Sequence, residues 1–503
     1  MAARSFAVIA AGLVALLALG PVVAVVWRAG GFASFGPGDM QALRFTLWQA
    51  AASAALSVGL AIPVARALAR RRFVGRGLLV ALLGAPFILP VIVAVLGLIA
   101  VFGSQGLVNR ALSGLGLPSL SIYGAHGVIL AHVFFNLPLA TRMILQGWLA
   151  IPGERLRLAA ALDLGPWTML RVLEWPMLRR IAPQAFAVIF VICLSSFAVA
   201  LTLGGGPRAT TVELAIYQAM RFDFDLGRAA ALACLQLVLA LSAGLAALAL
   251  SGGTGFGAGL DRAIPRWDAD RAGAKVLDAA WIGFAALFLL TPLVLVTLNG
   301  VPGLTQLGAS TLAAAGRSLA VALASTLLCL LWALPLATRR GEVAGLAGIA
   351  ISPLVIGTGL FIVVRPYAAP TDLALPVTML VNALAALPFA LRILRPEAES
   401  IRAEHRRLAQ SLGLSGRVWL MRILLPRLSR PLGFAAGLTA ALSMGDLGVI
   451  ALFADPGHAT LPFHVYGLMG SYRMEAAQGA ALLLLALSLG LFWLFDRGGR
   501  VNA

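Results

Sequence analysis

The chain alternates long apolar runs with short polar segments. About twelve runs of roughly twenty residues recur along its 503 residues, and each is long enough to cross a bilayer as a helix whose backbone groups are satisfied internally. The expected spans are 6–27, 46–68, 78–102, 126–146, 185–203, 227–250, 277–298, 318–338, 344–365, 373–393, 432–453 and 476–495. This pattern predicts an all-α polytopic membrane protein.

Composition narrows the alternatives. The mean hydropathy is +0.95 and only 12% of the residues are charged, whereas a large soluble protein accounts for one or two long apolar runs but not for so many. The first run, which follows Arg4, is longer than the apolar core of a signal peptide and lacks a small-residue cleavage site. We therefore expect an uncleaved first span.

Basic residues predict the orientation of the spans. With the N-terminus placed in the cytoplasm, 29 of the 38 lysines and arginines fall in inner loops, as the positive-inside rule requires. The net charge of +18 is therefore explained by membrane topology. The lipid bilayer is the expected partner of this charge pattern, and nucleic acid is not.

The two halves of the chain are related by an internal repeat. A shift of 250 residues aligns 132–181 with 382–431 without a gap and gives fifteen identities in fifty positions. The shared residues include Arg142 with Arg392, Glu154 with Glu404, and Pro176 with Pro426. Both copies keep the same orientation, so we expect a parallel repeat. Its parts are a six-helix half at 1–250, a cytoplasmic linker at 251–275 and a second six-helix half at 276–503.

A cytoplasmic segment recurs in both halves, at 147–184 (the first elbow) and at 394–431 (the second elbow). The first elbow is expected to form a helix from Gly153, a turn at Gly165 and a second helix as far as Pro176. The apolar positions of its first helix are Leu156, Ala159 and Leu162. Such a helix is suited to docking in a groove of a partner. The alternative is a basic helix lying on anionic lipid, for which a matched pair of sites has no purpose.

The second elbow resembles the EAA loop of ABC importer permeases, whose pattern is E-A-A, three residues, G, nine residues and I-x-L-P. The matching positions hold Gly413, Ile423, Leu425 and Pro426. In the first elbow Asp163 stands at the glycine position, and Arg157 and Arg407 replace the leading glutamate. In that family the loop is the coupling helix that fits a cleft in the ATP-binding subunit. The resemblance therefore implies these coupling residues: Glu154, Arg157, Ala159, Asp163, Gly165, Pro176, Glu404, Arg407, Ala409, Gly413, Ile423 and Pro426.

Nearly the whole chain is similar to the fused two-copy permease of bacterial thiamine importers. The stretches that carry the similarity are LAHVFFNLPLATRMILQ, LTLGGGPRATTVELAIYQA, SMGDLGVIALF and TLPFHVYGLMGSYR. The resemblance implies an inner-membrane permease subunit that moves thiamine, with or without its phosphates, by alternating access. It also implies two copies of an ATP-binding subunit and a periplasmic thiamine-binding protein as partners. Fused permeases for ferric iron or other small solutes share the architecture and are the alternative.

The energy source is expected on another protein. The single lysine, Lys275, lies in AGAKVL, which does not match the phosphate-binding pattern G-x-x-x-x-G-K-[ST]. We therefore expect no enzymatic activity and no bound cofactor in this chain, with ATP and Mg²⁺ held by the ATPase partner. A secondary transporter would carry ionisable groups in its spans for coupling ions, but the predicted spans hold chiefly Asp446. A membrane scaffold that recruits a partner without transport is a further alternative.

Asp446 is the leading candidate for the translocation pathway, together with Ser195 and Ser443. A carboxylate deep in a span costs about 2–3 kcal/mol to insert, so it is expected to face a cavity or a partner. One interpretation is an anion on the route of a cationic substrate, since the resemblance implies thiamine with its fixed positive charge. The other is helix packing or capping beside Gly445.

The remaining polar features are expected to have structural or docking roles. The turn at 204–207 is expected on the periplasmic side, where it and the nearby Thr210, Thr211 and Glu213 touch the binding protein. The five histidines show no metal-ligand spacing, so no metal site is expected. The three cysteines lie in apolar runs and are interpreted as small buried side chains.

Overall fold

The computed structural model describes residues 2–29, 35–84, 88–250, 270–338, 351–414, 416–453, 455 and 457–501. Within these ranges every regular element is a helix, and eleven helices are long and apolar enough to cross a membrane. The predicted all-α polytopic fold is confirmed. The predicted run 344–365 lies partly outside the described residues, and its described part holds the short helix α16. Most of the predicted linker, 251–269, lies outside them as well.

The helices follow the repeat. Those of the first half are α1 (Ala2–Ala29), α2 (Pro37–Arg70), α3 (Arg76–Leu82), α4 (Val91–Phe102), α5 (Leu107–Gly114), α6 (Ala125–Leu149), α7 (Gly153–Ala161), α8 (Pro166–Met169), α9 (Trp175–Leu194), α10 (Phe197–Leu203), α11 (Val212–Arg221) and α12 (Leu226–Leu250). Those of the second half are α13 (Ala272–Gly303), α14 (Ala309–Leu336), α16 (Pro353–Val364), α17 (Ala374–Ser411), α18 (Gly416–Trp419), α19 (Leu425–Arg427), α20 (Ser429–Met444), α21 (Gly448–Phe453), α22 (Leu461–Gly470) and α23 (Met474–Val501).

Several predicted spans have the wrong ends because hydropathy does not detect helix breaks. The run 78–102 is divided between α3 and α4, the run 185–203 between α9 and α10, and the run 432–453 between α20 and α21. The run 373–393 is instead too short, since α17 continues to Ser411 and so includes the start of the second elbow.

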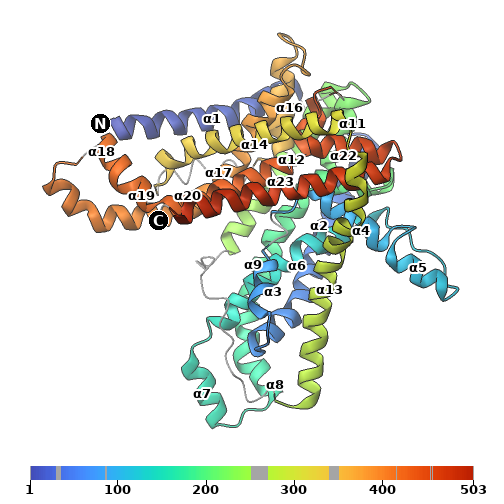
Figure 1. Ribbon diagram of the computed structural model, residues 1–503, viewed down its shortest axis with the longest axis vertical. Helices are drawn as coiled ribbons and strands as arrows, with labels where there is room; N and C mark the ends of the chain where they lie inside the picture. The colour runs from blue at the N-terminus through green and yellow to red at the C-terminus, as the bar shows by residue number, and fades with distance from the viewer. Residues whose placement is uncertain are drawn as a thin grey trace.

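Two arms meet at one end and diverge towards the other (Figure 1). The first arm contains α2, α6 and α9, and the second contains α14, α17, α20 and α23. The first helix of each repeat packs against the other repeat: α1 contacts α14 and α16, and α13 contacts α2 and α4. Each of these helices also contacts the last helix of its own repeat, α12 or α23. The sequence repeats are therefore interlocked in space.

The helices α1 and α13, which pack against the other repeat and are called the exchanged helices, are held by equivalent crossings. At each crossing a glycine of one helix meets a proline of the other. A Cβ on Gly97 in α4 would lie 2.7 Å from the carbonyl oxygen of Pro292 in α13. A Cβ on Gly359 in α16 would overlap the carbonyl oxygen of Pro21 in α1 in the same way. Small residues let helix backbones approach closely, which is how helices associate in a membrane.

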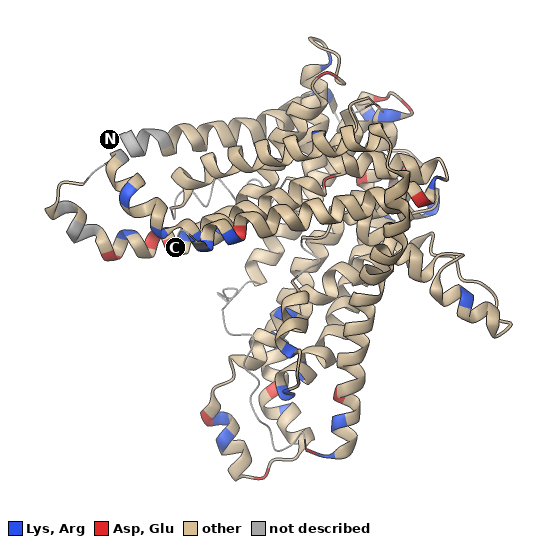
Figure 2. Ribbon diagram, viewed as in Figure 1, with Lys and Arg blue, Asp and Glu red and all other residues tan. Residues whose placement is uncertain are grey.

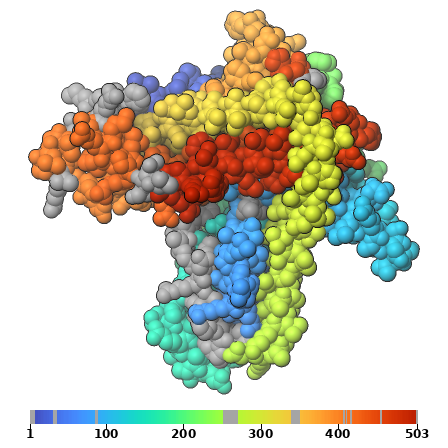
Figure 3. All heavy atoms as spheres, viewed as in Figure 1, coloured from blue at the N-terminus to red at the C-terminus, as the bar shows by residue number. Residues whose placement is uncertain are grey.

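Each elbow lies at the end of a different arm. We call this end of the arm its elbow end. The space-filling view shows the two elbow ends well apart, while the arms are packed together at the opposite, meeting end (Figure 3). Charged residues gather near the ends of the arms, and long stretches between them carry none (Figure 2). Ala10 and Val14 of α1 belong to the same apolar cluster as Leu424 and Leu428 of the second elbow.

Candidate functional site

Each repeat contains one broken helix, and the two breaks lie at the same repeat position. In the first, α9 ends at Leu194 and α10 begins at Phe197. In the second, α20 ends at Met444, 250 residues later, and α21 begins at Gly448. Irregular backbone at this depth of a membrane protein is tolerated where it is buried in protein or lines a cavity, and transporters place their substrate sites at such breaks.

Buried amides satisfy the first break. A helix end leaves its last carbonyl groups without partners in the helix, and here Gln49 Nε2 donates to the carbonyl of Cys193 (2.9 Å) while Gln236 Nε2 donates to that of Leu194 (3.0 Å). His132 Nε2 lies 2.6 Å from Ser196 Oγ in the break itself. These contacts explain why an apolar stretch that reads as one span is divided.

Repeat-related residues hold the second break. Asn382, which occupies the repeat position of His132, donates to Ser443 Oγ (3.0 Å). Ser443 in turn lies 3.2 Å from Ser325 in α14. In the first half the same place in α2 holds Ser53, 3.3 Å from His132 Nδ1. The pathway candidate Ser443 is thus a structural partner of Asn382 as well as a lining residue.

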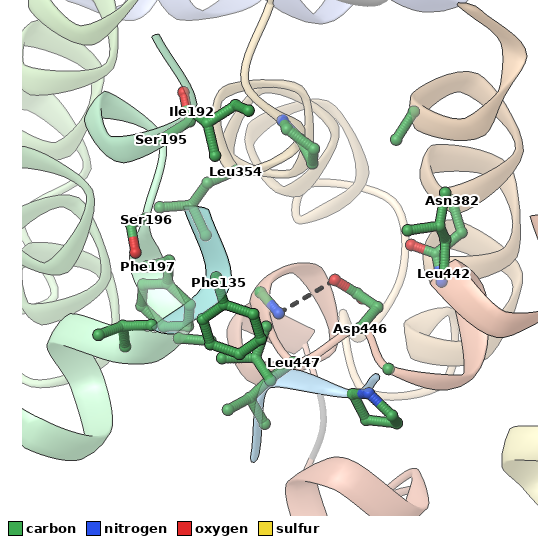
Figure 4. A pocket seen from close by; sticks show the side chains of 18 of the residues that line it. Phe135, Ile192, Ser195, Ser196, Phe197, Leu354, Asn382, Leu442, Asp446 and Leu447 are labelled. Atoms are coloured by element: carbon green, nitrogen blue, oxygen red, sulfur yellow. Dashed lines mark hydrogen bonds between the residues drawn. The ribbon is translucent and has the colours of Figure 1, made fainter. Parts of the chain in front are cut away.

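Asp446 caps a helix and also lies at the second break. Its Oδ1 accepts a hydrogen bond from the Gly448 amide (3.1 Å) and so caps α21 (Figure 4). Its Oδ2 is buried and has no hydrogen-bond partner among the described residues. One oxygen therefore caps the helix, and the other is buried without a hydrogen bond to the described residues.

The breaks face a cavity of about 420 Å³ between the two repeats. All three predicted pathway residues, Ser195, Ser443 and Asp446, line it. Figure 4 shows Ser195 and Ser196 on one side of the open space and Asn382 and Asp446 on the other. The other lining groups that matter for chemistry are His132, Asn136, Glu213, Ser352 and the rings of Phe135, Phe197 and Phe389. Among the described lining residues there are two carboxylates and neither lysine nor arginine.

The prediction that Thr210, Thr211 and Glu213 touch a partner on the surface is wrong. Their exposed fractions are 8%, 1% and 2%. Thr211 caps α11 by accepting from the Leu214 amide (3.3 Å), and the Val212 amide donates to Thr46 Oγ1 in α2 (2.9 Å). A threonine before a helical run is a helix-start signal, so this sequence feature could have revealed that the chain folds back into the protein here.

The first elbow has the predicted helix, but only one of its three predicted apolar anchors is exposed. Leu156 and Ala159 are buried, but Leu162 is 62% exposed. Glu154 and Arg157 form an exposed pair with Oε1 and Nη2 3.3 Å apart. The Ala159 carbonyl accepts from the Leu164 amide (3.1 Å), which closes the end of α7.

A left-handed residue explains the glycine of the motif. Asp163 has φ +45° and Gly413 has φ +62°, each just beyond the end of its helix. In the second elbow the Leu414 amide donates to the Ala409 carbonyl (2.8 Å), as Leu164 does to Ala159 in the first. Glycine favours this conformation, and aspartate is among the few other residues that adopt it. The departure at Asp163 therefore preserves the backbone geometry.

The helices continue through the prolines at which they were expected to end. A π-helical turn, Leu170–Glu174, precedes Pro176, and another, Leu420–Leu424, precedes Pro426. Proline removes a hydrogen-bond donor and clashes with the preceding turn of an α-helix, and a wider π turn relieves this. Gly165 caps the short α8, Ile423 is half-buried in the second π turn and Glu404 is exposed. The side chain of Arg407 lies outside the described ones.

Comparison with known proteins decides the family. No protein-family model matches the chain. The thiamine transport system permease protein ThiP of Brucella abortus is 39% identical over 511 residues, which cover 97% of this chain and 94% of that protein. The ThiP of Escherichia coli is 41% identical over 480 residues, 90% of this chain and 88% of that protein. This chain belongs to the ThiP permease family.

A more distant relative matches a shorter stretch. The molybdenum transport system permease protein ModB of Azotobacter vinelandii is 30% identical over 178 residues, 35% of this chain and 78% of that protein. A ThiP-family permease is a multi-pass transport subunit, so the membrane fold and the transport class expected from the sequence are confirmed together.

Proposed function

We propose that this chain is the membrane-spanning subunit of an ATP-driven thiamine importer in the bacterial inner membrane. The observation that carries this proposal is the identity of 39–41% to thiamine transport permeases over at least 90% of the chain. The acidic, phenylalanine-lined cavity between the repeats supports it, because thiamine carries a fixed positive charge on an aromatic ring.

Two copies of a separate ATP-binding subunit are proposed to dock on the elbows, which then lie in the cytoplasm together with the N-terminus. The elbows expose apolar side chains at matching repeat positions, Leu162 (62%) and Leu412 (61%). Trp167 adds another exposed apolar group at 74%. Apolar anchors flanked by charge are the features by which a short helix binds a groove. ATP and Mg²⁺ are bound by that partner and not by this chain.

The proposed mechanism is alternating access. ATP binding draws the two ATPase subunits together, and the elbows with them. The arms then close at the elbow end and open at the meeting end, where a periplasmic thiamine-binding protein delivers the substrate. In the structure the elbow ends are apart and the meeting end is packed, which is the arrangement expected before ATP binds. ATP shifts the equilibrium between the two arrangements only because it binds more strongly to the one in which the elbow ends are closed.

Uptake of radiolabelled thiamine tests the transport proposal. A strain without its own thiamine permease is expected to regain uptake when it expresses this chain with its ATPase and binding protein. Ferric iron and a polyamine serve as control solutes, and preferential uptake of either would overturn the assignment. Import into liposomes by the purified chain alone would overturn the dependence on ATP.

A matched pair of variants tests the docking. Leu162→Asp and Leu412→Asp are each expected to abolish capture of the ATPase subunit, because each places a charge in an apolar contact. Leu115→Asp is the control, because Leu115 is an exposed apolar residue (74%) directly after α5 and far from the elbows, and it leaves capture intact. Normal capture by both elbow variants would exclude the elbows as the docking site.

Asp446→Asn tests the cavity. The amide keeps an oxygen that caps α21 but removes the negative charge, so thiamine uptake is expected to fall by about tenfold while capture of the ATPase subunit is unchanged. An unchanged transport rate would exclude a role for this charge.

A further inference from the structure

A second carboxylate, Glu213, lines the same cavity as Asp446 and comes from the other repeat. Glu213 lies in the first turn of α11, Asp446 lies two residues before the start of α21, and α11 and α21 pack against each other. Each repeat thus contributes one acid to the lining of the cavity.

Neither acid has a basic partner among the described residues. Asp446 has a free buried oxygen, and Glu213 accepts hydrogen bonds from the neutral groups Ser352 Oγ and Gln236 Nε2 (3.4 Å). Buried carboxylates inside a membrane protein are costly and are usually paired with each other or with a cation. Their placement in a cavity with three phenylalanine rings favours an organic cation as the missing partner, because aromatic faces attract cations as well.

The donor from Ser352 crosses between the repeats. Ser352 precedes α16 and caps it, since its Oγ also accepts from the Leu354 amide (3.2 Å). Leu354, in the first turn of α16, lies at the cavity in Figure 4. The hydroxyl group reaches Glu213 in the present arrangement, with α11 and α16 brought together in one apolar cluster at the meeting end. Separation of the arms at that end would withdraw the hydroxyl and leave the carboxylate to a ligand.

We propose that Glu213 is the second carboxylate that binds the cationic group of the substrate, and that Ser352 competes with the cation for it when the meeting end closes. This deepens the proposed function and rests on it. The cavity then binds the cation more strongly while the meeting end is open and more weakly once it has closed. That difference favours release towards the elbow end, because a change of arrangement alters a ligand's affinity only through contacts that differ between the two arrangements.

The test uses the complete importer, purified without nucleotide, and equilibrium binding of radiolabelled thiamine. Ser352→Ala is expected to tighten binding by about tenfold, because the competing donor is gone, and to slow uptake. Glu213→Gln is expected to weaken binding and uptake by about tenfold. In the double variant Glu213→Gln/Ser352→Ala the gain from the serine change disappears, since there is no charge left to compete for.

The control is Ser488→Ala. Ser488 in α23 also donates across the repeats, to the Ile88 carbonyl (3.2 Å), but it does not line the cavity. It is expected to leave thiamine binding unchanged, which separates competition for Glu213 from general loosening of the contact between repeats. Glu213→Asp, which keeps the charge, is expected to retain part of the binding and shows that the loss in Glu213→Gln is not a folding failure.

Three results would overturn the proposal. They are unchanged or weaker binding in Ser352→Ala, normal uptake by Glu213→Gln, and a double variant that keeps the full gain of the serine change. Each is read against wild-type thiamine uptake. Absence of uptake by the wild-type importer would instead overturn the proposed function, and this inference with it.

Discussion

The two elbows have the same backbone and different attachments. Both contain a left-handed residue after the first helix and a π turn before a proline. The first elbow, however, is separated from α6 by a break and is tied by an ion pair between Glu174 and Arg66 in α2 (2.8 Å), in which Glu174 is fully buried. At the repeat position of Glu174 the second elbow has the buried apolar Leu424, and it continues directly from α17.

This comparison shows which features the two elbows share. Backbone geometry is kept even where the residues differ, as at Asp163 and Gly413. The buried contact between elbow and arm is an ion pair in the first elbow and apolar in the second. Both kinds are tolerated at a buried position, provided that a buried charge has its partner. The predictions below test that division, beginning with the largest effect.

Exchange of the buried pair should have the largest effect. Glu174→Leu alone leaves Arg66 without its ion-pair partner and is expected to destabilise the protein by about 3 kcal/mol. The double variant Arg66→Thr/Glu174→Leu introduces the residues of the second arm. In this part of the repeat α2 aligns with α14 as Pro63 aligns with Pro335, and that alignment pairs Arg66 with Thr338. The double variant should recover most of that loss. Thermal unfolding of the detergent-solubilised protein measures both, and a double variant as unstable as the single one would show that the arms are not interchangeable here.

The left-handed position should have an intermediate effect. Gly413→Val forces a branched side chain into φ +62° and is expected to cost about 1–2 kcal/mol, with weaker capture of the ATPase subunit. The reciprocal change Asp163→Gly keeps the geometry and is expected to alter stability by less than about 0.5 kcal/mol. The same unfolding assay applies to both. An equal loss in the two variants would mean that the side chain at this position matters more than its backbone conformation.

The smallest effect is expected at the meeting end, where the repeats agree. Thr46 Oγ1 accepts from the Val212 amide (2.9 Å), and Ser318 Oγ accepts from the Leu461 amide at the start of α22 (2.7 Å). Thr46→Val and Ser318→Ala should each cost about 1 kcal/mol. Thr297→Val, which removes an exposed hydroxyl bonded only within its own helix, is the control. Clearly unequal losses of stability would show that α11 and α22 are held differently.

The amino-acid sequence alone determined the membrane class, the parallel repeat, the two elbows and the candidate Asp446. These properties depend on local composition, because a bilayer requires apolar runs of a certain length and a duplicated segment keeps its residue pattern. Ser195 and Ser443 were predicted together with Asp446 as pathway residues, and all three line the cavity. The ends of the helices at 194 and 444 could not be predicted, since the few polar or glycine residues at each break, within 195–196 and 445–448, are flanked by apolar residues on both sides.

Only the tertiary structure decided what those local elements form. The exchange of α1 and α13 depends on glycines at crossings between distant helices, such as Gly97 with Pro292. The breaks depend on donors such as Gln49, 144 residues away from the carbonyl it satisfies. The burial of Glu213 depends on α11 folding back against α2. Each of these is a contact between segments far apart in the chain, and a local pattern of apolar and polar residues does not specify which distant partner completes it.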